Sequence, residues 1–466
     1  MMQLSTIAKA VNGQLLGAEC EIQSVGTDSR AILSNQLYVA IKGEHFDGNR
    51  FAEKAIEKGA AAVLVSDPQT KAGSSIVVDD TRLALGDLAK YWRNQFDIPV
   101  IAITGSNGKT TTKEMLSAIL VAATKDVTKV HATVGNLNND IGMPLTLLKL
   151  NKQHAYAVIE MGMNHLGEID YLSRIAQPNV ALINNAGTAH IGELGSRENI
   201  AKAKGEIFNG LNNNGIAVIN ADDTFCAYWQ SLNAGKKIIT FGLSKTADIT
   251  ASYTETDGLS LIQLSTPTGS VTFKLNMLGK HNIANALAAS AVAVALGVSN
   301  QDIANGLQNM RAVHSRLQSM AGLNGALLID DTYNANPDSM KAAIDVLAAI
   351  DGARIFVMGD MGELGADAAQ MHADIGAYAR QKGITNLLAF GALSANAVRV
   401  FGKDEHSKGA QHFLELNDLI NNVKSLMQKN VTVLVKGSRF MKMERVVESL
   451  TQQNLQKSLM EDVQCY

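Results

Sequence analysis

The sequence contains few cysteines, with only Cys20, Cys226 and Cys465 among its 466 residues. An odd number of widely spaced thiols supports neither a disulfide framework nor a thiolate metal cluster. A reducing compartment is therefore expected.

The sequence also has no excess of charge of one sign. Its 41 Lys and Arg residues nearly balance 44 Asp and Glu residues, for a formal net charge of −3. This balance gives no electrostatic reason to expect nucleic acid or an acidic membrane as a partner. Small soluble ligands are expected instead.

Long hydrophobic runs are missing as well. The most apolar stretch, residues 286–298, is too short and too rich in alanine to span a bilayer. Residues 1–13 lack the basic start and apolar core of a signal peptide. We therefore expect no membrane insertion and a cytoplasmic location.

The chain is long enough for about three domains. Residues 1–90 contain short apolar strands at 36–41 and 61–65 with a helical pattern at 50–58 between them, which predicts a small N-terminal α/β domain. A helix over 81–94 then leads to Pro99 and to a fully apolar run at 100–104.

Residues 91–312 alternate buried-type strands with helical patterns, which predicts a parallel, doubly wound sheet in a central domain. A β-hairpin is expected around residues 266–269, followed by a helix from about Asn282. After residue 311 the alternation begins again, and a third, Rossmann-like α/β domain is expected over 313–466. The predicted strands are 100–104, 157–160, 180–184, 216–220 and 238–241 in the central domain, and 326–329, 355–358, 386–390 and 431–435 in the third.

A phosphate-binding loop is expected directly after the strand at 100–104. The loop opens a helical pattern at 113–123, so its backbone N–H groups point from a helix N-terminus toward a bound phosphate. Lys109 would neutralise the transferring phosphate, and the Thr110 hydroxyl would bind Mg²⁺. The predicted ATP-binding loop residues are Gly105, Ser106, Asn107, Gly108, Lys109, Thr110 and Thr111.

This loop departs from the general phosphate-loop pattern, because Ile103 stands where the first glycine would fall. A plain glycine-rich turn between strand and helix is the alternative. Gly-Lys-Thr directly after a buried strand favours nucleotide binding over that alternative. The reaction is not determined by this motif.

Two side chains at neighbouring strand ends are candidates for metal binding. Glu160 ends the strand at 157–160, and His190 lies in the loop after the strand at 180–184. Ligands collect at this edge of open α/β sheets, and a carboxylate there suits Mg²⁺. Taken alone, a strand-end glutamate is more often a solvated loop residue, and a lone loop histidine is as often without function as functional.

Lys204 differs from its neighbour Lys202 in the helical pattern at 197–211. Lys202 lies off the apolar face, whereas Lys204 falls four residues after Ile200 and four before Phe208, on the inward side. Desolvation would lower the pKa of Lys204 and make its amine nucleophilic, so reaction with CO₂ could give an N-carboxylate that binds a second Mg²⁺. The alternative is that its four-carbon stem carries the ammonium to water.

Together these motifs resemble the Mur ligase family, the ATP-dependent amino-acid ligases of cell-wall precursor synthesis, over nearly the whole chain. The resemblance implies that the loop is that family's own phosphate-loop variant. It further implies that Thr110 and Glu160 bind magnesium, that His190 belongs to a second magnesium site, and that Lys204 is carbamylated.

The resemblance assigns further ligand contacts. Asn282, in Gly-Lys-His-Asn at 279–282, matches the adenine-contacting position, and Arg316, in His-Ser-Arg at 314–316, matches an arginine that faces the nucleotide phosphates from the third domain. Asn334 and Asn336 are assigned to ATP as well. The implied catalytic residues are Lys109, Lys204, His190 and Arg316, and the implied UDP-substrate residues are Ser29, Arg30, Lys42, Asn136, Asn138 and Asn139.

Three third-domain motifs, at 330–337, 359–365 and 436–439, most resemble the branch of the family whose amine substrate is D-alanyl-D-alanine. The implied partners are UDP-N-acetylmuramoyl tripeptide and that dipeptide, with a monomeric enzyme expected. The implied reaction transfers the γ-phosphate of ATP to the tripeptide carboxylate, and the dipeptide amine then attacks the acyl phosphate. Two alternatives stay open: a related ligase with another acceptor, such as a folylpolyglutamate synthetase, and a nucleotide hydrolase that forms no bond.

Overall fold

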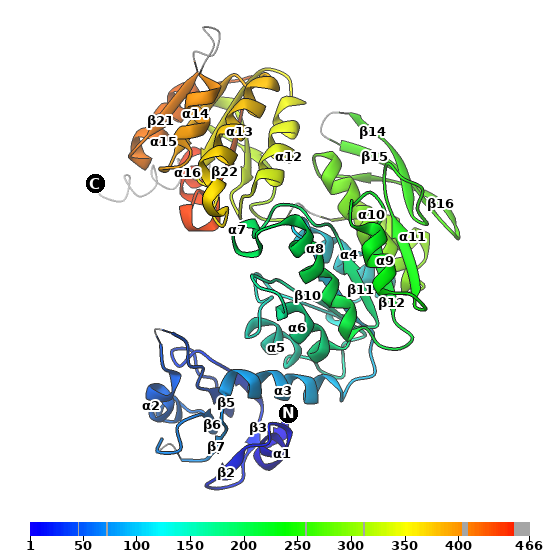
Figure 1. The fold of residues 1–466 in the computed structure, drawn as a ribbon, viewed down its shortest axis with the longest axis vertical. Coiled ribbons are helices and arrows are strands. Elements are labelled where there is room, and N and C mark those ends of the chain that lie inside the picture. Colours follow the sequence, from blue (N-terminus) through cyan, green and yellow to red (C-terminus); the bar gives the residue numbers. More distant parts are fainter. Residues whose placement is uncertain (45, 71–72, 257–258, 311–312, 403–408, 452–466) are drawn as a thin grey trace, which may run out of the picture.

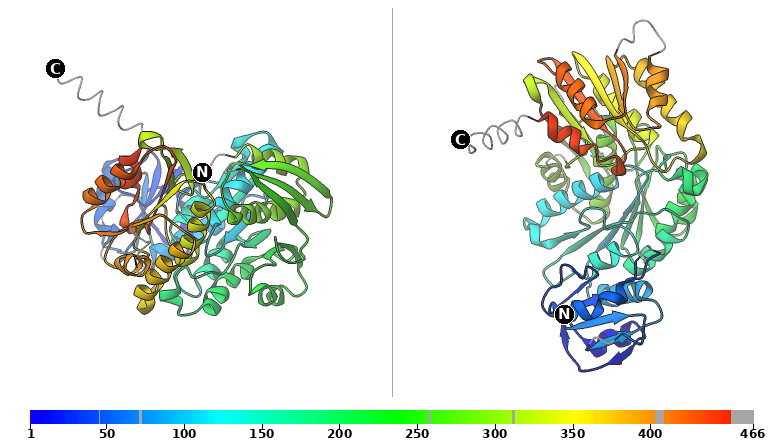
Figure 2. Two further views of the ribbon diagram at one scale, coloured as in Figure 1. Left: turned by 90° about the horizontal axis from the view of Figure 1, so that it is seen from above. Right: turned by 90° about the vertical axis from the view of Figure 1, so that its left-hand side faces the viewer.

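The computed structural model describes residues 1–44, 46–70, 73–256, 259–310, 313–402 and 409–451. Three α/β units follow one another along the long axis of the molecule (Figure 1), and the side view in Figure 2 shows the same order. The predicted α/β class with three domains is confirmed. The expected domain limit at residue 312 and Cys465 lie outside the described residues.

The N-terminal unit is built on a five-stranded sheet in the order β2-β7-β6-β5-β4, in which only the β2–β7 pair is antiparallel. The two predicted strands correspond to β5 (Gln36–Val39) and β6 (Ala62–Val65), both fully buried. The other elements are β1 (Met2–Gln3), α1 (Leu4–Ala10), β2 (Gln14–Leu16), β3 (Glu21–Ile22), β4 (Ser24–Gly26), η1 (Gly48–Phe51), α2 (Ala52–Glu57) and β7 (Ser75–Val77).

Helix α3 (Thr81–Arg93) joins this unit to the central one. Its N-terminus is capped by the Asp80 side chain, and its apolar residues pack in one core with residues of both units. At its C-terminus the buried Arg93 guanidinium donates hydrogen bonds to the carbonyls of Ala176 and Phe96. The helix therefore continues through residue 90, where the first domain limit was expected, and is fixed to the central unit at its end.

The central sheet has six parallel strands in the order β13-β12-β11-β8-β10-β9. Helices cover both faces, which explains why its inner strands are continuous apolar runs. Because β8 lies between β11 and β10, the loops that leave these three strands meet at one edge. The strands are β8 (Val100–Thr104), β9 (Val130–Ala132), β10 (Tyr156–Glu160), β11 (Val180–Ile183), β12 (Ile216–Asn220) and β13 (Lys237–Phe241).

The central helices complete this layer. The longest are α4 (Lys109–Thr124) and α10 (Lys280–Ala295), which pack together under the sheet. The others are η2 (Val127–Lys129), α5 (Gly142–Leu147), α6 (Glu168–Ala176), α7 (Ile191–Leu194), α8 (Arg197–Gly205), η3 (Glu206–Gly210), α9 (Cys226–Leu232) and α11 (Asn300–Gln308).

The predicted hairpin is confirmed and belongs to a larger sheet. Strands β15 (Leu259–Thr266) and β16 (Gly269–Leu275) pair antiparallel across a two-residue loop, and β14 (Thr250–Thr256) adds a third strand that the sequence did not predict. This small sheet projects from the side of the central unit (Figure 1).

The third unit has a six-stranded sheet in the order β17-β18-β22-β19-β20-β21, parallel except for β17. The last strand, β22, lies between β18 and β19, so the loops after these three strands are neighbours. Its elements are β17 (Gln318–Ala321), η4 (Leu323–Gly325), β18 (Leu327–Asp331), α12 (Pro337–Ala348), β19 (Ala353–Gly359), η5 (Gly365–Asp367), α13 (Ala368–Gln381), β20 (Asn386–Phe390), α14 (Ala395–Phe401), β21 (Ala410–Phe413), α15 (Leu416–Leu426), β22 (Val431–Lys436), η6 (Arg439–Met441) and α16 (Glu444–Leu450).

Membrane-spanning helices were searched for over the described residues. None of the helices there combines the length and the apolar character needed to cross a bilayer.

Candidate active site

The phosphate loop forms the tight turn between β8 and α4. Gly108 has φ 79°, and a Cβ at this position would collide with the side chains of Asn285 and Asn184. Helix α4 starts at Lys109, so the loop amides point along its axis as expected. The Ser106 hydroxyl is buried and has no hydrogen-bond partner in the described part of the protein. The amides of Ser106 and Asn107 donate to the carbonyl and side-chain oxygens of Asn185, so these contacts hold the loop in place at the cavity wall.

Lys109 is folded back over this loop, with its Nζ donating to the Gly105 carbonyl at 2.6 Å. Burial lowers the pKa of Lys109, although the nearby Glu160 carboxylate opposes that shift. A buried lysine ammonium whose hydrogen bond is to a backbone carbonyl loses little free energy when it exchanges that carbonyl for a phosphate.

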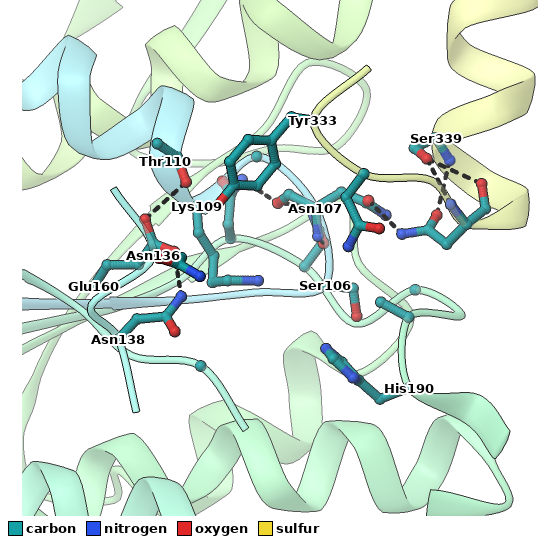
Figure 3. A pocket seen from close by; sticks show the side chains of 18 of the residues that line it. Ser106, Asn107, Lys109, Thr110, Asn136, Asn138, Glu160, His190, Tyr333 and Ser339 are labelled. Carbon is teal, nitrogen blue, oxygen red and sulfur yellow. Dashed lines mark hydrogen bonds between the residues drawn. The ribbon is translucent and has the colours of Figure 1, made fainter. Parts of the chain in front are cut away.

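Glu160, at the end of β10, is 2% exposed and held on both carboxylate oxygens. Its Oε2 accepts a hydrogen bond from the Thr110 hydroxyl at 2.8 Å, and its Oε1 accepts one from the Asn138 amide at 2.8 Å. Figure 3 shows these groups beside Lys109. A hydroxyl and a carboxylate together are the oxygen ligands that Mg²⁺ prefers.

Lys204 lies on α8 and is 2% exposed, so the prediction that it points inward is correct. Burial, and secondarily the Lys109 ammonium, hold the pKa of Lys204 well below its usual range. Among the described residues no carboxylate forms an ion pair with it. A buried lysine without a carboxylate partner is suited to remain an uncharged, nucleophilic amine.

His190 follows β11 and has a left-handed backbone, with φ 63°. Its Nδ1 lies 2.7 Å from Oε2 of Glu363, which comes from the third unit. The His190 contact lowers the pKa of the Glu363 carboxyl. Glu363 belongs to the motif at 359–365, but nothing in the sequence links it to His190, so its role could not be predicted.

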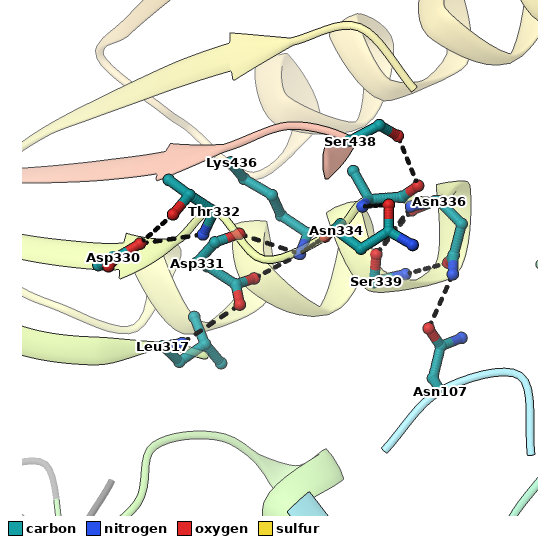
Figure 4. A network of polar contacts seen from close by, with 11 residues as sticks. Asn107, Leu317, Asp330, Asp331, Thr332, Asn334, Asn336, Ser339, Lys436 and Ser438 are labelled. Carbon is teal, nitrogen blue, oxygen red and sulfur yellow. Dashed lines mark hydrogen bonds and ion pairs between the residues drawn. The ribbon is translucent and has the colours of Figure 1, made fainter. Parts of the chain in front are cut away.

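The third unit closes over the phosphate loop. Arg316 donates from its guanidinium to the Thr110 hydroxyl at 2.9 Å and lies 4.1 Å above the Tyr333 ring. The Arg316 Nε is buried and has no partner in the described part of the chain. The Asn336 amide donates to Asn107 Oδ1 at 2.8 Å (Figure 4). These contacts place a third-domain cation directly against the loop.

An ion pair behind Arg316 fixes the third-domain wall. Lys436 Nζ lies 2.6 Å from Asp331 Oδ2 and also donates to the Asn334 carbonyl at 2.9 Å (Figure 4). The Asp331 carboxylate accepts from the Leu317 amide as well. This arrangement joins the ends of β18 and β22 and determines where Arg316 and Asn334 lie.

Most of the remaining predicted residues line one cavity, and the N-terminal ones do not. Asn282 is buried in the cavity wall, where its amide donates to the Leu278 carbonyl at 2.8 Å. The side-chain oxygen of Asn139 accepts a hydrogen bond from the Gly142 amide at the start of α5. One cavity of about 1450 Å³ is lined by Asn136, Asn138, Asn139, Glu160, His190, Asn282, Arg316, Asn334, Asn336 and the loop residues 106–111, among others.

The N-terminal candidates do not line that cavity. Ser29, Arg30 and Lys42 lie in the N-terminal unit, and the exposed Arg30 is paired with Asp28 at 2.9 Å. The cavity nevertheless extends toward them, since Arg82 and Leu83 of α3 form part of its lining.

His281, next to Asn282 in the cavity wall, makes the stability of the protein depend on pH. Burial, and then the Lys436 ammonium, lower the pKa of His281 to about 4. Its unfolded value is near 6.5, so the unfolded chain binds more protons between these values, and stability should fall as the pH drops from about 6.5 to about 4. The expected loss is at most roughly 3 kcal/mol.

We predict that His281→Gln flattens this acid slope, as measured by urea unfolding at a series of pH values. An identical slope in wild type and His281→Gln would show that His281 is not the responsible group.

A phosphate loop, a strand-end carboxylate and a cation from a second domain, all lining one cavity, define a nucleotide-dependent enzyme. The chain belongs to the Mur ligase family. It matches the Mur ligase catalytic domain over residues 21–93, the Mur ligase middle domain over 103–293 and the glutamate ligase domain over 315–439.

Characterised relatives cover almost the whole chain. The UDP-N-acetylmuramoyl-tripeptide--D-alanyl-D-alanine ligase of Escherichia coli is 44% identical over 96% of this chain and 98% of its own length. A crystal structure of MurF from Acinetobacter baumannii has a TM-score of 0.88 at 39% identity, covering 96% of this chain and 98% of that one. MurF ligase from Thermotoga maritima, in complex with ADP, has a TM-score of 0.78 at 26% identity, covering 92% and 96%.

Proposed function

We propose that this protein is an ATP-dependent ligase that adds D-alanyl-D-alanine to UDP-N-acetylmuramoyl tripeptide in peptidoglycan synthesis. The observation that carries the proposal is the meeting of Lys109 and Arg316, from different domains, at one phosphate loop in a cavity large enough for two substrates. The cytoplasmic location and monomeric state expected from the sequence belong to the same proposal.

Phosphoryl transfer to a carboxylate requires positively charged side chains close to the phosphate. The tripeptide carboxylate must attack the γ-phosphate of ATP. Both groups are anions, and they repel each other when they come within bonding reach. The Lys109 ammonium and the Arg316 guanidinium lower that repulsion, and the closed domains exclude water from the acyl phosphate. ADP leaves in this step, and phosphate leaves when the dipeptide amine attacks the acyl carbon and loses a proton.

We assign two magnesium sites to these side chains. Thr110 and Glu160 would hold one ion, and His190 with a carbamylated Lys204 would hold the other. Bound there, the ions would neutralise charge on the phosphate oxygens. Carbamylation joins the neutral Lys204 amine to CO₂ with loss of one proton, and it converts a buried amine without a carboxylate partner into a ligand for a cation.

A side cavity of about 520 Å³ supports the choice of a small zwitterion as acceptor. It lies at the ends of β18, β19 and β22 and shares Glu363 with the main cavity. Glu363 and Glu444 bring negative charge to this cavity, while Lys442 and Arg439, whose guanidinium lies 3.3 Å from the Glu444 carboxylate, bring positive charge. The ammonium and carboxylate of a dipeptide match these two signs of charge.

The UDP end of the nucleotide-linked substrate is assigned to the N-terminal unit through Ser29, Arg30 and Lys42. Asn136, Asn138 and Asn139 would line the muramoyl-peptide path toward Glu160. This arrangement uses the extension of the main cavity along α3.

The test is phosphate release from Mg-ATP with UDP-N-acetylmuramoyl tripeptide, comparing D-alanyl-D-alanine with single amino acids as the acceptor. We expect turnover only with the dipeptide and a pentapeptide product by mass spectrometry. Turnover with another acceptor would show that the assignment of the dipeptide as the amine substrate is wrong. ATP hydrolysis without any acceptor would indicate that the protein is a nucleotide hydrolase and not a ligase.

A further inference from the structure

Lys113 is a buried charge for which the ligase mechanism above has no use. It lies one helical turn after Lys109 on α4 and is 1% exposed. Its Nζ lies 2.5 Å from the Thr133 carbonyl and 2.6 Å from Oε1 of Glu114. Burying an ammonium is costly unless it is paired and hydrogen-bonded, so this position depends on both contacts.

Thr133 is held from two further directions. It directly follows β9, and its amide donates to the Val158 carbonyl at 3.0 Å. Its own hydroxyl accepts a hydrogen bond from the backbone amide of Glu160 at 2.9 Å. Thr133 is therefore the link between Lys113 and the residue that ends β10.

Glu160 is consequently fixed at three points. The Thr133 hydroxyl holds its backbone amide, and Asn138 and Thr110 hold its two carboxylate oxygens. Asn138 belongs to the loop that begins at Thr133, so the Lys113 contact anchors two of these three supports. Groups that orient a metal ligand in this way commonly affect metal affinity by about 10- to 100-fold.

We propose that Lys113 is a positioning residue that acts through Thr133 to hold the Glu160 carboxylate in register with the phosphate loop. Because Lys113 and Thr110 are on the same helix, the two oxygen ligands move together with the loop. The inference rests on the proposed role of Glu160 in binding a divalent cation.

The test compares two variants of one side chain. Thr133→Val keeps the shape but removes the hydroxyl, whereas Thr133→Ser keeps the hydroxyl. Mn²⁺ binding to the full-length protein, measured by electron paramagnetic resonance with a nonhydrolysable ATP analogue, should weaken about tenfold or more in Thr133→Val. It should stay within about twofold of wild type in Thr133→Ser.

Lys113→Met should reproduce the Thr133→Val loss, and the double variant should be no weaker than the weaker single one, since both act on one chain of contacts. Lys125→Met, at an exposed position just after the same helix, is the matched control. Equal Mn²⁺ affinity in Thr133→Val and Thr133→Ser would overturn the inference, even if Lys113→Met failed to fold.

Glu160→Gln separates this inference from the proposed function. If Glu160→Gln binds Mn²⁺ as tightly as wild type, the role of Glu160 as a cation ligand is wrong. If Glu160→Gln weakens binding and Thr133→Val does not, only the positioning role of Lys113 and Thr133 is wrong.

Discussion

Replacement of Lys204 by alanine is expected to lower ligase turnover by about 10²- to 10³-fold, the range found when one charge-stabilising group is removed from an active site. The reason is that Lys204 is buried, lacks a carboxylate partner among the described residues, and has a pKa held well below its usual range. Added bicarbonate should not restore the variant, because the amine that reacts with CO₂ is gone. Steady-state phosphate release with both substrates measures the effect.

The wild-type enzyme supplies the complementary result. CO₂ reacts only with the neutral amine, and the lowered pKa of Lys204 keeps that form present at lower pH than an ordinary lysine allows. Activity should therefore fall in CO₂-depleted buffer, most strongly on the acid side, and recover with bicarbonate. Lys202→Ala, on the exposed side of the same helix, should behave as wild type. Near-normal turnover of Lys204→Ala would remove this residue from the mechanism.

The phosphate loop and its strand were predictable because local signals agree. The apolar run of β8, the glycines of the turn and the Lys-Thr pair all fall within a dozen residues, and the strand was predicted with its bounds as observed. The inward position of Lys204 was predictable from helical periodicity, since an offset of two residues, roughly half a turn, separates it from the exposed Lys202.

Contacts between domains could not be predicted in the same way. The pairing of His190 with Glu363 and the contact of Asn336 with Asn107 depend on how two separate sheets meet. Strands β14 and β21 were missed because they lie at sheet edges, where polar residues interrupt the apolar pattern. The link from Lys113 to Glu160 was also hidden, since a lysine four residues after Lys109 suggests an ordinary helix surface.

Arg316→Ala is expected to lower kcat by about 10²- to 10³-fold, as for the loss of a preorganised charge at a transferring phosphoryl group. Arg316 is a third-domain cation that donates to the Thr110 hydroxyl and lines the main cavity. Arg316→Lys should recover only part of the activity, because an ammonium cannot both reach Thr110 and stack over Tyr333 as the planar guanidinium does. Initial rates at saturating ATP and acceptor provide the measurement.

The same variants test whether Arg316 also holds the domains together. If closure depends on this contact, small-angle X-ray scattering with a nonhydrolysable ATP analogue should give a larger radius of gyration for Arg316→Ala than for wild type. Arg399→Ala, an exposed arginine of the third domain that bonds only to Asn396 among the described contacts, should change neither kcat nor the radius of gyration. A low kcat with an unchanged radius would assign Arg316 to charge stabilisation alone. Three other contacts would then suffice to keep the domains closed: Asn336 with Asn107, Asp338 with the Thr188 amide, and Glu363 with His190. An unchanged kcat together with an unchanged radius would exclude it from both roles.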